Sequence, residues 1–241
     1  MIQAISNCYK WFAIYPVLIV TTSLAGSILI LLSFIGLADF GSRTLATRWA
    51  RINLRCCLIK ATVTGRSNVQ PGQSYVIAAN HQSLIDIYLV YGFSPVEFKW
   101  VMKKELGAIP ILGAACRAMG HILIDRSNPQ SAISSINRAS QKIKNGMSIV
   151  FFPEGTRSDD NDVLPFKKGA FRLAIELGLP ILPVSLHDTG KLVPNGTVDW
   201  KPGQISMQIH QPIATNLLTL ADLDDLKDHV RQQIVNALTH P

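Results

Sequence analysis

The sequence is poor in charge. Charged residues make up 16% of its 241 residues, against about a quarter in soluble domains. None occurs between Lys10 and Asp39. As one helix, Trp11–Ala38 would extend about 42 Å, enough to cross a hydrocarbon core about 30 Å thick. The stretch is much longer than the apolar part of a signal peptide, about 7–15 residues, so we expect a membrane-embedded helix.

Acidic residues are nearly missing from the first quarter of the chain. Residues 1–66 contain Asp39 alone against seven basic residues, and they carry +6 of the total net charge of +7. The rest of the chain is close to neutral, so it lacks the basic stripe that a nucleic-acid partner needs. A basic segment beside an apolar one is typical of contact with anionic lipid. The basic residues are Lys10, Arg43, Arg48, Arg51, Arg55, Lys60 and Arg66.

The segment Phe40–Val63 alternates arginines with large apolar residues, a spacing typical of an amphipathic helix at a membrane surface. Two arrangements of residues 11–63 remain open: one spanning helix with a basic cytoplasmic flank, or a helical hairpin in one leaflet. We expect residues 1–63 to form a membrane anchor and residues 64–241 a catalytic domain. The expected location is the inner (cytoplasmic) membrane, with the domain on the cytoplasmic side.

The sequence also lacks the signatures of several enzyme classes. Its four cysteines show no metal-ligand spacing, and the adjacent pair Cys56-Cys57 is a poor disulfide framework. No Gly-x-Ser-x-Gly motif is present, so a serine hydrolase has no candidate nucleophile. His121, His187 and His210 fall in or beside apolar runs, and we expect them to be structural. No metal site is expected.

Short apolar runs alternate with helical patterns from Thr62 onward. This alternation predicts an α/β fold with a mixed, largely parallel sheet flanked by helices. The expected strands are 61–64, 75–79, 98–102, 121–125, 148–152, 181–186 and 205–210. The expected helices are 84–92, 111–118, 130–145, 168–177 and 220–238.

His81 and Asp86 are the first candidates for chemistry. His81 follows the predicted strand at 75–79, and Asp86 lies near the start of the next helix. Residues five apart on a helix diverge by about 140°, so the two side chains meet only if His81 lies in the turn. Ser83 favours this placement because Ser-x-x-Asp resembles a capping box. The pair is either a general base with its orienting carboxylate or a turn histidine beside a helix cap.

Two further strand ends carry arginine, Arg126 after 121–125 and Arg157 after 148–152. The carboxyl ends of parallel strands share one edge of a sheet, where α/β proteins bind ligands. Arginine recognises phosphate with a planar fork, so a phosphate site is a candidate here. Lys103, Lys104, Lys167 and Lys168 lie nearby in the sequence pattern. Each piece alone is also compatible with a surface ion pair or a simple turn.

Four blocks, taken in order, resemble those of the glycerophospholipid acyltransferases, especially the bacterial 1-acyl-sn-glycerol-3-phosphate acyltransferases. They are Asn80-His81-x4-Asp86, Gly120-x4-Asp125-Arg126, Phe152-Pro153-Glu154-Gly155-Thr156-Arg157 and Leu179-Pro180-Ile181-Leu182-Pro183-Val184. Lys103-Lys104-Glu105-Leu106 and Phe166-Lys167-Lys168-Gly169 also look like that family. The resemblance covers residues 60–215. Leu123 departs from it, because the family commonly has an aromatic residue there.

The resemblance implies roles for these residues. His81 would deprotonate a lysophospholipid hydroxyl and Asp86 would orient the imidazole. Arg126, Glu154, Gly155 and Arg157 would shape the acceptor site, with Thr156 and Lys103 as weaker candidates. Pro183 would shape the acyl or thioester pocket. No cofactor is implied, since acyl-CoA or acyl-carrier protein brings an activated acyl group as co-substrate.

We therefore predict a membrane enzyme that acylates the sn-2 hydroxyl of 1-acyl-glycerol-3-phosphate (lysophosphatidic acid) to give phosphatidic acid. Its expected partners are membrane phospholipids, this lysolipid and the acyl donor. Two alternatives stay open: another lysolipid acceptor, such as a lyso-ornithine lipid or lysophosphatidylcholine, or a non-catalytic membrane-anchored phospholipid binder. A thioesterase is a third class, which would release fatty acid without an acceptor.

Overall fold

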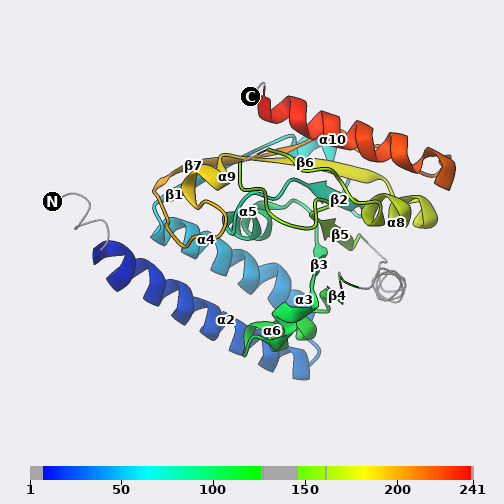
Figure 1. Cartoon of the computed structure of the whole chain (residues 1–241). Coiled ribbons are helices and arrows are strands. Elements are labelled where there is room, and N and C mark those ends of the chain that lie inside the picture. The colour runs from blue at the N-terminus through cyan, green and yellow to red at the C-terminus, as the bar shows by residue number, and fades with distance from the viewer. Residues whose placement is uncertain (1–7, 126, 128–145, 161, 240–241) are drawn as a thin grey trace.

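The computed structural model describes residues 8–125, 127, 146–160 and 162–239. Within them, seven strands form one sheet in the order β1-β7-β6-β2-β5-β3-β4 (Figure 1). The strands are β1 (Ile59–Thr64), β2 (Val76–Ala79), β3 (Phe98–Lys103), β4 (Ile122–Ile124), β5 (Ser148–Phe151), β6 (Ile181–His187) and β7 (Gly203–Ile209). The predicted helix 130–145 and Arg126 lie outside the described residues.

The sheet is mixed and largely parallel, as predicted. β2 pairs in parallel with both β5 and β6, and β3 pairs in parallel with β5 and β4. β7 is antiparallel to β6, and β1 is parallel to β7, so these two strands run the opposite way. The carboxyl ends of β2 to β6 therefore lie at one edge, which brings together turns far apart in the sequence.

Helices cover both faces of the sheet. On one face, α4 (Thr47–Cys56) and α5 (Ile85–Phe93) contribute to a buried cluster that also takes in Ile77 and Ala79 of β2. On the other face, α8 (Gly169–Leu177) and α10 (Leu223–Thr239) pack over Val76 and Ala78. The central strands are buried on both sides, which is why they read as continuous apolar runs.

The apolar N-terminal stretch forms the first arm of a helical hairpin. A π-helical turn at Lys10–Ile14 leads into α2 (Tyr15–Phe34), and a turn at Gly36 reverses the chain. The second arm consists of α3 (Ala38–Gly41), a π-helical turn (Ser42–Ala46) and α4. Lys10–Phe34 is the one candidate membrane span found among the described residues, and it is close to the predicted Trp11–Ala38.

The prediction of one amphipathic helix over Phe40–Val63 was wrong at its end. α4 stops at Cys56, and Leu58 takes a positive φ of 56° before β1 begins at Ile59. The β-branched residues of Ile59–Thr64 pair with β7, and burial of Ile59 outweighs continuation of the helix. Residues 59–63 therefore belong to the sheet, although the sequence analysis placed them in the anchor at residues 1–63.

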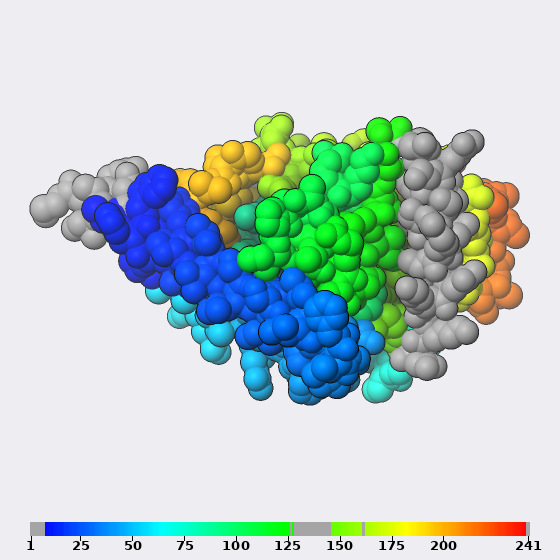
Figure 2. Space-filling model, turned by 90° about the horizontal axis from the view of Figure 1, so that it is seen from below, coloured from blue at the N-terminus to red at the C-terminus, as the bar shows by residue number. Residues whose placement is uncertain are grey.

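The hairpin packs along the sheet domain. Near the start of α2, Lys10 pairs with Asp199, and the Tyr15 hydroxyl donates to the Val198 carbonyl at 3.0 Å. In its middle, Gly26 packs so closely on Ile111 that a Cβ there would lie 2.7 Å from the Ile111 Cγ2. Figure 2 shows α2 (blue) beside the segment that contains α6 (Leu112–Ala118, green).

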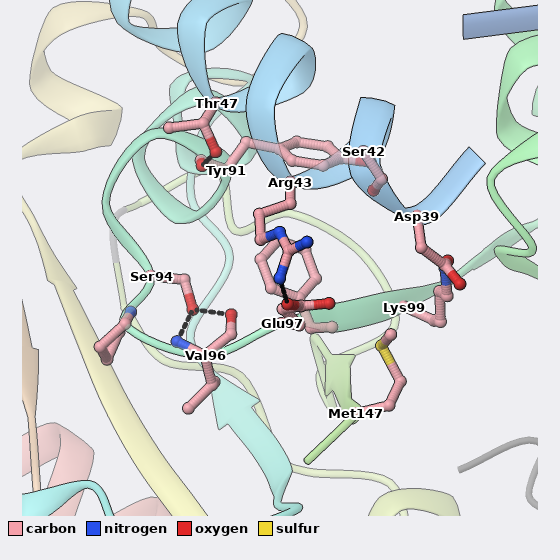
Figure 3. A pocket seen from close by; sticks show the side chains of 12 residues that line it. Asp39, Ser42, Arg43, Thr47, Tyr91, Ser94, Val96, Glu97, Lys99 and Met147 are labelled. Atoms are coloured by element: carbon pink, nitrogen blue, oxygen red, sulfur yellow. Dashed lines mark hydrogen bonds and ion pairs between the residues drawn. The ribbon is translucent and has the colours of Figure 1, made fainter. Parts of the chain in front are cut away.

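A pocket of about 220 Å³ lies between the second arm and the start of β3 (Figure 3). Two ion pairs cross it: Arg43 bonds Glu97 at 2.6 Å, and Lys99 bonds Asp39 at 2.7 Å. Each pair joins the hairpin to the sheet domain. Exposed ion pairs contribute only about 0–1 kcal/mol to the free energy of unfolding. We therefore expect these two pairs to orient the hairpin on the sheet domain, and the apolar packing to stabilise it.

Gly113→Ala is expected to destabilise the fold where the chain packs under α2. A Cβ at Gly113 would lie 2.2 Å from the Gly107 carbonyl oxygen, which belongs to the backbone and cannot turn away. We expect the free energy of unfolding to fall by about 1–3 kcal/mol, measured by urea denaturation in detergent.

Gly169→Ala is the matched control for this substitution. Gly169 also lies in a helix, and a Cβ there meets nothing within 4 Å. The control should leave stability unchanged or raise it by up to about 1 kcal/mol. Equal effects of the two substitutions would contradict the close contact.

Candidate active site

The turn after β2 is anchored by Asn80. Its side chain is fully buried, and it donates to the Leu186 carbonyl at 2.9 Å and accepts from the Leu186 amide at 2.8 Å. These two bonds join the end of β2 to β6. They fix the point at which the chain leaves the sheet, and so fix the position of His81.

His81 and Asp86 meet as predicted. The His81 Nδ1 lies 2.7 Å from the Asp86 Oδ2, and the Asp86 side chain is fully buried. His81 lies in the turn and Asp86 in the first turn of α5. A carboxylate can only accept, so Nδ1 carries the proton in this bond and Nε2 is left as an acceptor. This is the tautomer that a general base requires.

The same carboxylate oxygen also fixes the turn. Asp86 Oδ2 accepts from the backbone N–H groups of Gln82 at 2.8 Å and Ser83 at 2.9 Å. The Ser83 hydroxyl accepts from the Ile85 amide at 3.2 Å and donates to the Val193 carbonyl. Gln82 and Ser83 precede α5, and α5 has no side-chain cap, so Asp86 holds the preceding turn and does not cap the helix. The same side chain holds this turn and orients His81.

The turn after β5 folds against His81. The Phe152 ring stacks on the imidazole, with ring centres 3.8 Å apart and planes 7° from parallel. The Ser158 amide donates to the His81 carbonyl at 3.2 Å. The imidazole is thus held flat between its carboxylate partner and an aromatic face.

Glu154 lies beneath the His81 backbone. Its Oε1 accepts from the His81 amide at 2.6 Å and its Oε2 from the Leu164 amide at 2.9 Å, with only 3% of the residue exposed. Burial raises the pKa of Glu154 to about 7, helped by the nearby charge of Asp86 and opposed by the two backbone bonds. The expectation that Glu154 shapes the acceptor site differs from this geometry, in which Glu154 holds the turn that carries His81.

The other residues predicted to bind substrate differ in their exposure and in whether they line the cavity at His81. Gly155 has a positive φ of 77°, which favours glycine whatever the space around it. Thr156 is exposed and Arg157 is half-buried. Arg157 and Lys103 both line the same cavity as His81.

Several nearby charges are already paired. Lys104 bonds Asp125 at 2.5 Å and Lys168 bonds Asp224 at 2.8 Å. The Lys104 ammonium group, together with the Ser127 hydroxyl and amide, lowers the pKa of Asp125 to about 2. Their ion pairs leave Lys104 and Lys168 less available to an incoming phosphate than Arg157.

Pro183 lies within β6, paired with Ala78 of β2, and it is not among the described residues that line the cavity. Its neighbours in β6 alternate between the sheet faces: Leu182 and Val184 belong to the cluster on the His81 side, and Ile181 to the other. By this alternation Pro183 faces α8 and α10, away from the cavity.

The other histidines named in the sequence are tied into the core. His121 Nε2 bonds the Tyr91 hydroxyl, its Nδ1 accepts from the Trp100 amide, and burial lowers its pKa to about 3. His210 bonds the Ser185 hydroxyl at 2.8 Å. Burial also lowers the pKa of His187 and His210.

A cavity of about 370 Å³ begins at His81. Its charged lining residues, within the described chain, are Lys103 and Arg157. The other walls are mostly apolar and come from α2, α5, β3 and α6, including Gly26, Leu29 and Met119. The site therefore combines the His81–Asp86 pair, a cationic rim and an apolar interior.

Comparisons with known proteins agree with this arrangement. Residues 60–187 match the acyltransferase family. A 1-acyl-sn-glycerol-3-phosphate acyltransferase of Limnanthes alba is 32% identical over 91% of this chain and 78% of its own length. The chain belongs to the acyltransferase family. This confirms the predicted resemblance.

Two further relatives extend the comparison. A chloroplast 1-acyl-sn-glycerol-3-phosphate acyltransferase of Brassica napus is 35% identical over 80% of this chain and 55% of its own length. The crystal structure of the 1-acyl-sn-glycerophosphate acyltransferase from Thermotoga maritima matches with a TM-score of 0.83 and 27% identity, over 98% of this chain and 96% of that one. The chain spans about half the length of the first curated relatives, 48–55%.

Sequence reasoning missed two features of this acyltransferase site. Phe152 was assigned to the end of a strand, yet its ring stacks on His81. Glu154 was assigned to the substrate, yet it holds the His81 backbone. An acidic residue directly after a buried strand indicates a functional or structural role for its carboxylate. The partner of Glu154 could not be predicted, because it depends on the pairing of β2 with β5, and His81 lies 73 residues away in the sequence.

Glu154→Gln is expected to remove a pH dependence of stability. The pKa of Glu154 rises from 4.5 in the unfolded chain to about 7, so the folded protein binds more protons between these values. The free energy of unfolding therefore falls as pH rises through this window, by about 3 kcal/mol, and is level above it. The variant should lack this decline when unfolded in urea across the same pH series.

Glu176→Gln is the matched control because Glu176 is an exposed glutamate on α8. It should keep the wild-type decline. A wild-type slope in Glu154→Gln would mean that another group, and not Glu154, titrates in this window.

Proposed function

We propose that the protein transfers an acyl group from acyl-CoA or acyl-carrier protein to the sn-2 hydroxyl of 1-acyl-glycerol-3-phosphate, giving phosphatidic acid. The observation that carries this proposal is the bond between His81 Nδ1 and Asp86 Oδ2, which leaves Nε2 as an acceptor at the head of an apolar cavity. A binder of phospholipids does not require this pair. The named activity of the relatives supports the same reaction and acceptor.

His81 acts as general base in this reaction. Nε2 takes the proton of the acceptor hydroxyl as the oxygen attacks the thioester carbonyl, and the C–O bond forms. The tetrahedral intermediate then expels the thiolate, which takes the proton back from the imidazolium. Asp86 stabilises the imidazolium between the two steps, because it accepts from Nδ1 throughout.

The acceptor phosphate is bound by cations at the rim. Arg157 and Lys103 line the cavity near His81 and supply positive charge, with the Arg157 fork suited to two phosphate oxygens. Arg126, outside the described residues, belongs to the same proposed set on the basis of its sequence block. Gly155 and Thr156 form the turn that carries Arg157.

The donor acyl chain occupies the apolar cavity. A CoA or carrier-protein thioester arrives from water, so burying its chain is favourable by about 0.8 kcal/mol for each methylene group. The walls from α2, α5 and α6 supply the apolar surroundings that this burial needs. Chain burial would therefore hold the thioester carbonyl beside His81 without any added cofactor.

The N-terminal hairpin, which we propose as the anchor, lies in one leaflet of the inner membrane and keeps the catalytic domain on the cytoplasmic side. The contacts of α2 at Lys10, Tyr15 and Gly26 with the sheet domain favour this hairpin over a spanning helix, because a helix bound along its length cannot also cross the bilayer. The outward face of the first arm of the hairpin exposes apolar residues that suit lipid, among them Phe12 before α2, and Leu24 and Phe34 within it.

His81→Ala is expected to lower acyl transfer by about 10²- to 10⁴-fold, the usual contribution of a general base, while lysophosphatidic acid still binds. Transfer is measured as thiol release from acyl-CoA with and without added lysophosphatidic acid. His229→Ala is the matched control, because His229 is exposed on α10 and should keep full activity.

The same assay separates the alternatives. Turnover only with a lyso-ornithine lipid or lysophosphatidylcholine would replace the proposed acceptor. Thiol release without any acceptor would indicate a thioesterase. Full transfer by His81→Ala would remove the general-base role, and binding with no transfer by the wild type would leave a phospholipid binder.

Membrane topology can be tested with the exposed Cys8. We expect Cys8, kept as the single cysteine, to react with a membrane-impermeant maleimide in inverted membrane vesicles without detergent. A cysteine at the exposed Leu217 of the catalytic domain reports that same side. A spanning helix would instead make Cys8 reactive only after the vesicles are permeabilised.

A further inference from the structure

Arg231 connects the C-terminal helix to the loop before α8. It lies on α10 beside Val230 and near Ile234, both fully buried, so its backbone is fixed on the sheet face opposite α4 and α5 (Figure 1). Its Nε donates to the Leu164 carbonyl at 3.1 Å, and its Nη2 donates to the Val163 carbonyl. Arg231 lies outside the sequence blocks from which the site residues were predicted.

The peptide group between Val163 and Leu164 has a charged partner at each end. Its carbonyl oxygen accepts from Arg231, and its N–H donates to the Glu154 Oε2 at 2.9 Å. In a planar trans peptide the C=O and N–H bonds point in opposite directions. A cation at the oxygen and a carboxylate at the N–H therefore both stabilise the peptide dipole. Hydrogen bonds to charged groups are stronger than neutral ones, and linked bonds polarise one another.

The carboxylate of Glu154 continues this series of hydrogen bonds to the active-site turn. Its Oε1 accepts from the His81 amide at 2.6 Å. The series therefore leads from the Arg231 guanidinium, through one peptide group and one carboxylate, to the backbone of His81. Glu154 is almost fully buried, so water competes poorly for these bonds. In this way α10 is joined to the turn after β2.

The loop before α8 is also held by contacts that do not involve the guanidinium. Val163 belongs to the buried cluster that includes Leu226 of α10, and the Lys167 amide donates to the Pro153 carbonyl at 2.8 Å. Apolar packing and this bond keep the loop near α10. The guanidinium adds a fixed direction for the 163–164 peptide group, and so for the N–H that meets the carboxylate.

Arg231 also acts on Glu154 through its charge. Burial raises the pKa of Glu154, the charge of Asp86 adds to this rise, and the two backbone bonds and the charge of Arg231 oppose it. Within the described residues, Asp86 on α5 and Arg231 on α10 are the charged groups that act on Glu154, and His81 contacts it through its backbone. Arg231 therefore favours the ionised carboxylate, which is the stronger acceptor from the His81 amide.

We infer that Arg231 is a positioning residue for the proposed reaction: through the 163–164 peptide group and Glu154 it fixes the backbone of His81, so that Nε2 stays aimed at the acceptor hydroxyl. This inference rests on the proposed function and extends the site to the C-terminal helix. A displacement of reacting groups by about 1 Å costs up to about 10²-fold in rate. A loosened turn should therefore slow the chemical step without weakening substrate binding.

Arg231→Gln tests this role in the full-length protein in vesicles. The variant keeps a polar side chain but lacks the charge and the guanidinium fork. We expect kcat for transfer from acyl-CoA to lysophosphatidic acid to fall about tenfold, with KM for both substrates within about twofold of wild type. Arg172→Gln is the matched control: Arg172 is exposed on α8 and bonds Glu176 of its own helix, so kcat should stay at the wild-type value.

A second measurement separates positioning from a loss of packing. Without the positive charge the pKa of Glu154 should rise further, so the decline in the free energy of unfolding between pH 4.5 and about 7 should extend to higher pH in Arg231→Gln. A loss of packing would lower stability equally at every pH. Arg231→Lys keeps the charge and should restore the wild-type window, but should recover kcat only in part because an ammonium group lacks the fork.

The double variant tests the route through Glu154. If Arg231 acts through this carboxylate, Arg231→Gln should cause little further loss of kcat in the Glu154→Gln protein. The same fold loss in both backgrounds would place the effect of Arg231 elsewhere and overturn the inference.

The remaining outcomes separate this inference from the proposed function. Wild-type protein that transfers no acyl group to lysophosphatidic acid overturns the function itself. Active wild type with wild-type kcat in Arg231→Gln, or with stability lowered equally at every pH, overturns only the positioning role. Should Arg231→Gln not fold, Arg231→Lys decides the question, since full kcat in that variant overturns the role of the fork.

Discussion

The site depends on one oxygen atom, Asp86 Oδ2. It accepts from the His81 ring and from the amides of Gln82 and Ser83, so it fixes the imidazole tautomer and the turn together. These roles are compatible because the turn places its N–H groups and the ring on the same side of the carboxylate. A charge buried this deeply requires such partners. Losing the carboxylate would therefore disturb the position of His81 as well as its protonation.

A second buried carboxylate supports the first. Glu154, which follows β5, accepts from the His81 amide, while Asp86 accepts from the His81 ring. His81 is therefore held through both its backbone and its side chain. Burial is the main cause of the raised pKa of Glu154, and the nearby charge of Asp86 adds to it. In the Glu-Gly-Thr-Arg block the acid thus holds the backbone of His81, while Arg157 lines the cavity.

The N-terminal hairpin, which is the proposed anchor, also forms part of the candidate active site. Thr22, Ala25, Gly26 and Leu29 of α2 line the same cavity as His81. Small residues at this contact let α2 approach α6 closely enough to complete the wall. A catalytic domain without the hairpin would lack one side of the proposed donor site. This coupling suits the proposed reaction, whose acceptor and product both stay in lipid.

The sequence by itself predicted the α/β class and six of the strands, because these follow from apolar periodicity. It also placed His81 and Asp86 in one turn by their spacing, but it left open whether their side chains meet. It could not determine whether residues 59–63 continue the helix, because only pairing with β7 made them a strand. It also could not assign Glu154 to the His81 backbone, stack Phe152 on the ring, or turn Pro183 away from the cavity. Those features depend on which strands lie side by side and which face each residue takes. Tertiary structure alone decides this, because the pairing energy comes from residues distant in the chain.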